Sequence, residues 1–154
     1  MRALGIDYGR RRIGLALSDA TGMLARPWKA IECPGGIAGA AAALAAEVDG
    51  LAADSDGLAA IVVGHPRRLS GEPNEQTAAV ESLAARLRQT TGLPVVLQDE
   101  RLSSREAETR LALREKDWRK RRPMLDAAAA AVILQDYLDS QPRPSRAADE
   151  DESL

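Results

Sequence analysis

Three acidic residues stand where a carboxylate needs a specific partner, and the first of them is Asp7. It ends a short apolar run at residues 3–7, where an ionised side chain opposes strand formation and costs free energy unless a cation pairs with it. Asp7 therefore predicts a neighbouring metal ion or basic group. The alternative is that it accepts hydrogen bonds from the backbone amides of the turn at Tyr8 and Gly9.

Glu100 is the second candidate, because it follows an apolar run at residues 94–97 that is typical of a short buried strand. Functional groups of open α/β sheets gather at the carboxyl ends of such strands. Asp99 beside it is a competing candidate at the same place. The alternative for Glu100 is a surface salt bridge to Arg101 or Arg105.

Asp126 is the third candidate, and its helical neighbours make it the most informative. The residues four, seven and eleven positions later are Ala130, Ile133 and Tyr137, which form a largely apolar stripe. This stripe predicts that Asp126 points toward a sheet. An acid in a first helical turn also gains about 0.3–1 kcal/mol from the helix dipole. That gain would be the same on the solvent face, so it does not explain the stripe.

Three carboxylates that converge from two strand ends and a helix would repel one another unless a cation neutralises them. Hard oxygen ligands suit Mg²⁺ or Mn²⁺. Two such ions, about 3.5–4 Å apart, can activate water and stabilise the leaving oxygen in phosphodiester cleavage. We therefore expect Asp7, Glu100 and Asp126 to be both the metal ligands and the catalytic residues.

Basic side chains near these acids are candidates for binding substrate phosphates. The densest run spans residues 114–122, with six basic and two acidic groups, and a solvated charged loop is the alternative. The single histidine, His65, is expected in a loop, with a proton shuttle as the less favoured role. The candidate substrate-binding residues are Arg11, Arg12, His65, Arg67, Arg101, Ser103, Arg119, Lys120, Arg121 and Arg122.

The elements that must position these groups follow from the spacing of apolar residues. A short apolar run predicts a strand at residues 3–7, and period-2 alternation predicts a second at 13–18. We expect a third strand at 23–31, whose Pro27 favours a sheet edge. Continuous apolar runs predict buried strands at 59–63 and 94–97. Helical spacing predicts helices at 35–53, 74–91, 103–116 and 123–139, the last beginning at Pro123. This order predicts an α/β fold with a mixed sheet flanked by helices.

Length and composition limit what this scaffold does. A chain of 154 residues has room for one domain, which we place at residues 1–139, followed by an acidic tail at 140–154 that we expect to be disordered. The net charge of −2 argues against nucleic acid, but residues 1–138 alone carry 19 basic and 18 acidic groups. The single cysteine, Cys33, excludes an intramolecular disulfide. No segment is typical of a leader or a membrane span, so we expect a cytoplasmic protein with no membrane partner.

Four motifs in order along the chain resemble the YqgF (RuvX) family. They are Leu4-Gly5-Ile6-Asp7-Tyr8-Gly9 continuing to Ser18-Asp19, Ile61-Val62-Val63-Gly64 with Pro66 and Gly71, Asp99-Glu100-Arg101-Leu102-Ser103-Ser104 with Ala107-Glu108, and Asp126-Ala127 continuing to Tyr137-Leu138.

Family members are described as Holliday junction resolvases and as pre-16S ribosomal RNA nucleases. The resemblance implies an RNase H-like fold with a five-stranded mixed sheet and helices on both faces, and an acidic triad of Asp7, Glu100 and Asp126 that binds metal. Where the family usually has an apolar residue this chain has His65, and the pair Arg67-Arg68 is a second departure. Both concern the substrate loop and not the triad.

The resemblance implies a metal-dependent endonuclease, a hydrolase of ribosome biogenesis that acts on structured RNA, with branched DNA as the alternative substrate. Two readings from other classes stay open. Gly5-Ile6-Asp7-Tyr8-Gly9 also resembles the first phosphate loop of actin-like ATPases and sugar kinases, although those proteins close two such domains around ATP. The other reading is a non-catalytic nucleic-acid-binding member of the family. Oligomeric state stays open.

Overall fold

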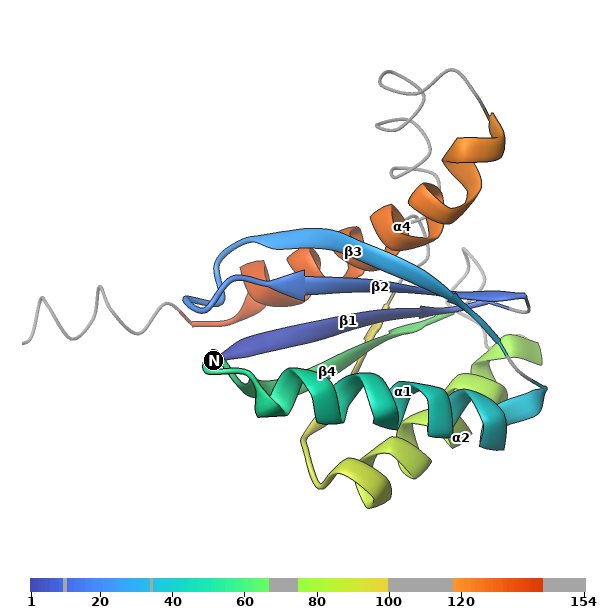
Figure 1. Ribbon diagram of the computed structural model, residues 1–154, viewed down its shortest axis with the longest axis horizontal. Coiled ribbons are helices and arrows are strands. Elements are labelled where there is room, and N and C mark those ends of the chain that lie inside the picture. The colour runs from blue at the N-terminus through green and yellow to red at the C-terminus, as the bar shows by residue number, and fades with distance from the viewer. Residues whose placement is uncertain (10, 34, 67–74, 100–117, 143–154) are drawn as a thin grey trace, which may run out of the picture.

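A five-stranded mixed sheet forms the centre of the molecule in the computed structural model, which describes residues 1–9, 11–33, 35–66, 75–99 and 118–142 (Figure 1). The strand order is β3-β2-β1-β4-β5. The strands are β1 (Arg2–Tyr8), β2 (Arg12–Ser18), β3 (Ala25–Glu32), β4 (Leu58–His65) and β5 (Val95–Asp99). The first three strands are antiparallel neighbours, and β4 and β5 run parallel to β1. The predicted α/β fold and mixed sheet are confirmed.

Helices cover both faces of this sheet, as Figure 1 shows. One face carries α1 (Gly36–Ala53) and α2 (Glu75–Thr91), and the other carries α4 (Trp118–Ser140). Alternate side chains of β1 pack on opposite faces of the sheet. Leu4 and Ile6 pack against α1 and α2, whereas Ala3 packs against α4. The predicted apolar face of α2 is confirmed, because Val80, Leu83, Ala84 and Leu87 are buried.

Small residues let α4 lie directly on the sheet. An ideal Cβ placed on Gly5 of β1 would lie 2.8 Å from the Cβ of Leu134 and 2.9 Å from the carbonyl oxygen of Ala130. A side chain at position 5 would therefore push the helix away. Ala130 of α4 has the same effect on the approach distance, since it is completely buried in one cluster with Ala16 and Val62 of the sheet.

The edge prediction for the third strand is confirmed, since β3 is the first strand in the order and pairs only with β2 within the described sheet. Ala16 pairs with Pro27 and Leu15 pairs with Lys29, so Trp28 is an extra residue in β3. Such a bulge beside Pro27 suits a proline, which has no amide hydrogen to donate to a ladder.

The start of the last helix was predicted wrongly. We expected it at Pro123 with the basic run outside it, but α4 begins at Trp118 and includes residues 119–122. Arg and Lys are good helix formers, so the helix extends toward the N-terminus through this run. Pro123 is the sixth residue of this helix. A proline inside a helix lacks the amide hydrogen that would bond to the preceding turn, and its ring crowds the carbonyl four residues earlier, an arrangement that kinks a helix. The helix expected at 103–116 and the tail from 143 onward lie outside the described residues.

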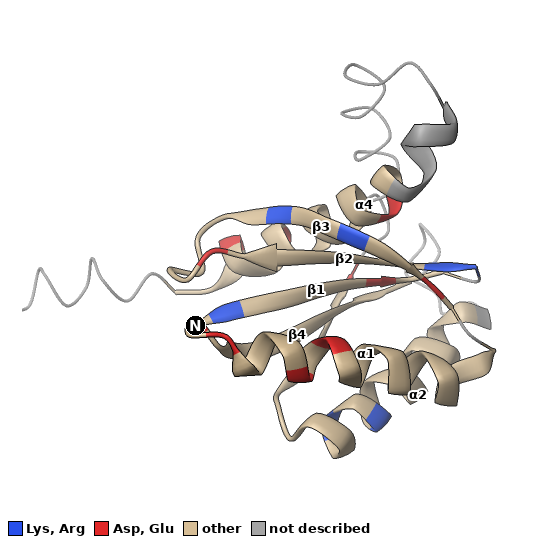
Figure 2. Cartoon of the chain, in the orientation of Figure 1, with Lys and Arg blue, Asp and Glu red and all other residues tan. Residues whose placement is uncertain are grey.

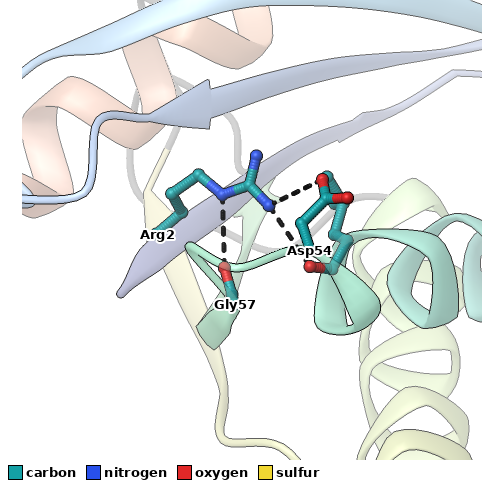
Figure 3. A network of polar contacts seen from close by, with 4 residues as sticks. Arg2, Asp54 and Gly57 are labelled. Carbon is teal, nitrogen blue, oxygen red and sulfur yellow. Dashed lines mark hydrogen bonds and ion pairs between the residues drawn. The ribbon is translucent and has the colours of Figure 1, made fainter.

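The start of β1 is fixed by the side chain of its first residue, Arg2, which Figure 3 shows. Its Nε donates to the carbonyl of Gly57, and one Nη donates to the carbonyl of Leu51 and to Asp54, each at 3.2 Å. These bonds join the end of α1 and the turn before β4 to the first strand. By length and composition α1 is able to span a membrane, but here Leu44, Val48 and other residues of α1 are buried in the core.

Candidate active site

Asp7 lies near the end of β1 on the face covered by α4. Residues 3 and 5 of the same strand face α4, and side chains two positions apart share a face. Asp7 pairs directly with Gly14 of β2. The adjacent turn amide, that of Gly9, donates to the carbonyl of Arg12 at 3.1 Å and closes the β1–β2 hairpin.

Gly14 is the point at which α4 touches the hairpin. An ideal Cβ on Gly14 would lie 1.9 Å from the carbonyl oxygen of Asp126, so only glycine permits this approach. Because Asp7 is the cross-strand partner of Gly14 on the same face, the main chain at Asp126 lies beside Asp7. The structure thus brings the main chains of two of the three predicted ligands, Asp7 and Asp126, near each other from opposite ends of the chain.

The Asp126 side chain faces the sheet as its apolar stripe predicts, since Ala130 and Ile133 are completely buried. Its Oδ2 accepts a hydrogen bond from the Arg12 Nε at 2.7 Å, in an ion pair whose two side chains are 31% and 29% exposed. Arg12 begins β2, two residues before Gly14 and on the same face. A predicted phosphate-binding arginine is therefore bound to a predicted metal ligand.

Glu100, the third predicted carboxylate, lies outside the described residues and directly follows Asp99, the last residue of β5. Within the part of the chain that the structure describes, no group of three His, Cys, Asp or Glu side chains lies close enough to hold a metal ion. Asp7 and Asp126 supply hard oxygen donors of the kind that Mg²⁺ and Mn²⁺ prefer. These two residues fit part of a divalent-cation site.

His65 was expected in a loop, and that prediction is wrong, because it is the last residue of β4. It shares a face with Val63, a residue of the α1–α2 core, so it lies on the opposite face from α4. Its Nε2 is 3.0 Å from the Oε1 of Glu81 on α2, and it is 8% exposed. The structure does not bring His65 to the side of the sheet that carries Asp7 and Asp126.

The remaining candidate substrate-binding residues are only partly described. Arg11 is exposed in the β1–β2 turn, where Figure 2 shows basic residues at the end of the hairpin. Arg67, Arg101 and Ser103 lie outside the described residues. Residues 119–122 lie in the first turns of α4, and their side chains are not described.

The residue after Asp7 belongs to the other layer. Tyr8 packs against the α1–α2 core, and its hydroxyl group lies 3.9 Å from the Cys33 sulfur. Burial, and then the hydrogen bond with Cys33, raise the pKa of Tyr8 above its ordinary value. The phenol is therefore protonated at neutral pH and supports the strand that carries Asp7.

Sequence reasoning missed Gly14, the residue that lets Asp126 approach Asp7. The available signal was a glycine in the middle of a strand, which often marks a close backbone contact. Neither that glycine nor the Arg12–Asp126 pair identifies its partner from sequence alone, because the contacting residues are more than one hundred positions apart.

The sequence profile of the RuvX family, described as Holliday junction resolvase, matches residues 1–140. This chain belongs to the RuvX family. A protein of Geobacillus kaustophilus named "Putative pre-16S rRNA nuclease" is 41% identical over 143 residues, which are 92% of this chain and 99% of that one. A protein of the same name from Syntrophus aciditrophicus is 39% identical over 158 residues, covering 99% and 100%.

Solved structures agree with the RuvX fold. The RuvC protein of Thermus thermophilus, in complex with a Holliday junction substrate, has a TM-score of 0.52 at 18% identity and covers 90% of this chain and 93% of that one. At this identity the likeness concerns the fold alone. The fold class, the family and the nuclease class inferred from sequence are confirmed.

Proposed function

We propose that this RuvX protein is a metal-dependent endonuclease that cleaves phosphodiester bonds in pre-16S ribosomal RNA. The observation that carries the proposal is the meeting of Asp7 and Asp126 on one face of the sheet, across the side-chain-free surface of Gly14. Acids that lie near each other need neighbouring positive charge, because like charges repel. Arg12 supplies one positive charge to Asp126, and a divalent cation at the same place would supply more. The names of the relatives supply the substrate class.

The proposed metal ligands are Asp7, Asp126 and Glu100, which follows β5 in the sequence. A divalent cation in this place would supply Lewis acidity and an activated water for phosphodiester hydrolysis. A second cation at the same site would complete a two-metal mechanism. The protein's part is to hold the carboxylates on rigid elements. Arg11 and Arg12, at the hairpin end beside them, would bind the phosphates of the substrate.

Branched DNA is the second candidate substrate, because the family profile is described as a Holliday junction resolvase. The same two carboxylates would serve either nucleic acid, since the cleaved bond is the same. We place the reaction in the cytoplasm, where ribosomal RNA is processed, and the proposed partner is structured RNA.

A parallel cleavage assay tests this function. Wild type and Asp7→Asn are incubated with precursor 16S RNA and with a four-way DNA junction, with and without Mn²⁺. Because Asn keeps the shape of Asp but loses its charge, we expect cleavage to fall by about 100-fold or more with the fold retained. Asp49→Asn, an exposed change on α1, is the matched control and should cleave like wild type.

The outcomes separate the alternatives. Faster cleavage of the RNA supports the proposed substrate, and faster cleavage of the junction supports branched DNA. Binding of RNA without cleavage by any variant would favour the non-catalytic reading. Cleavage by Asp7→Asn at the wild-type rate would show that Asp7 is not part of the active site.

A further inference from the structure

The Arg12–Asp126 ion pair places a cation on an oxygen that the proposed metal site needs. Arg12 Nε lies 2.7 Å from Asp126 Oδ2, and this is the only hydrogen bond of the guanidinium group among the residues that the structure describes. Glu32 is the cross-strand partner of Arg12 and is exposed, yet the arginine bonds to Asp126. Cross-strand partners share a face, so the face alone does not select Asp126; the close approach of α4 to Gly14 brings the Asp126 carboxylate within reach of Arg12.

The main chain fixes this pairing. Arg12 and Gly14 share the α4 face of β2, and the carbonyl of Asp126 lies directly over Gly14. The guanidinium group is therefore tethered within reach of the carboxylate whenever α4 is docked. Both side chains are about one-third exposed, so a small ion and a phosphate group both have access to the pair.

We propose that Arg12 and a divalent cation compete for the Asp126 carboxylate, so that the arginine neutralises this acid until metal displaces it. The inference rests on the proposed metal-dependent function and names the residue that controls entry to its site. An arginine has five N–H donors arranged to bind carboxylate or phosphate in pairs. Once displaced, the guanidinium group is free to bind a phosphate oxygen, which couples metal binding to anion binding.

Mn²⁺ binding to the nucleic-acid-free protein tests the competition without any cleavage reaction. Mn²⁺ is titrated into wild type, Arg12→Gln and Arg12→Lys, and the free ion is followed by electron paramagnetic resonance. Removing a partly exposed ion pair should tighten Mn²⁺ binding by up to about fivefold in Arg12→Gln. Arg12→Lys keeps a tethered cation and should stay near wild type.

Arg11→Gln is the matched control, because it removes the same charge from the next residue, whose side chain is exposed in the β1–β2 turn. If the competition is local, Arg11→Gln changes the Mn²⁺ affinity by less than Arg12→Gln. Equal effects of the two substitutions would show a general charge effect and overturn the proposal. Equal Mn²⁺ affinity of wild type and Arg12→Gln would also overturn it.

Asp126→Asn separates failure of this inference from failure of the proposed function. If wild type binds Mn²⁺ and Asp126→Asn does not, the metal site stands, and the Arg12 comparison then decides the competition alone. If neither wild type nor any variant binds Mn²⁺, the proposed metal site is wrong, and the proposed competition between Arg12 and metal is wrong as well. Thermal unfolding of each variant checks that α4 remains docked.

Sodium sulfate tests whether the Arg12 guanidinium group binds an anion once metal has displaced it from Asp126. Sodium chloride of equal ionic strength is the reference. Sulfate resembles a phosphate group and should bind the released guanidinium group, so it should tighten Mn²⁺ binding to wild type. Arg12→Gln should lose this effect. A sulfate effect of the same size in both proteins would contradict the exchange.

Discussion

Gly14 and Asp126 touch through their main chains, with 1.9 Å between the Asp126 carbonyl oxygen and the position that a Cβ of residue 14 would take. The contact joins the second strand to the last helix. It sets the position of Asp126 relative to both Arg12 and Asp7, which lie on the same face of the sheet. The geometry of the candidate site therefore depends on a residue with no side chain.

Gly14→Ala should destabilise the fold and displace α4. The added methyl group cannot share space with the Asp126 carbonyl, and overpacking of this kind costs about 1–3 kcal/mol, occasionally more. Urea unfolding measures the loss of free energy of unfolding.

Gly50→Ala is the matched control for that substitution. Gly50 lies within α1, and a Cβ placed there meets nothing within 4 Å. Alanine is the better helix former by about 1 kcal/mol, so this variant should equal or exceed wild type in stability. Equal stability of Gly14→Ala and wild type would contradict the close contact.

Arg2→Met should lower the free energy of unfolding by about 1–3 kcal/mol, because it removes the donor to the Gly57 carbonyl and leaves the Leu51 carbonyl with only the amide of Asp54. The Arg2 side chain is 13% exposed, so water replaces these bonds poorly. Urea unfolding provides the measurement. Arg86→Met, an exposed change on α2, should stay within about 0.5 kcal/mol of wild type, and an equal loss in both variants would contradict the prediction.

Asp19 should make the β2–β3 turn sensitive to acid. The Thr21 hydroxyl donates to it at 2.6 Å, the amides of Met23 and Leu24 also donate, and these bonds lower the pKa of Asp19 below its ordinary 3.8. A carboxyl group with a lowered folded-state pKa stabilises the fold above pH 3.8, and this stabilisation is lost as the pH falls through the folded-state pKa.

Asp19→Asn should therefore have a lower Tm than wild type at pH 7, and the difference should shrink as the pH falls below 3.8. Thermal unfolding of both proteins across this range measures it. A difference in Tm that stays constant with pH would contradict the role of the Asp19 charge.

Local patterns predicted much of this architecture. Pro27 placed its strand at the sheet edge because a missing amide hydrogen is tolerated there. Ala130 and Ile133 oriented Asp126 toward the sheet because helical spacing repeats on one face. The start of α4 was missed, because a proline after a basic run is typical of a first turn and gives no sign that the run is itself helical.

Contacts between distant segments could not be predicted in the same way. The sequence predicts Arg12 as a phosphate-binding residue and Asp126 as a metal ligand, but their ion pair depends on how α4 crosses β2. His65 was assigned to a loop because it lies in the polar segment that follows the apolar run at residues 59–63. It is instead the last residue of β4, two residues beyond the predicted strand, and it bonds to Glu81 on the helix that follows in the chain.

Mn²⁺ binding to Asp7→Asn, Asp126→Asn and the double variant tests the central claim that these two carboxylates form one metal site. If both carboxylates contact the same ion, each single substitution should weaken Mn²⁺ binding by about tenfold or more. The double substitution should weaken it by less than the product of the two single effects, because the effects of residues at a shared site do not add. Wild-type affinity in either single variant would contradict the shared site.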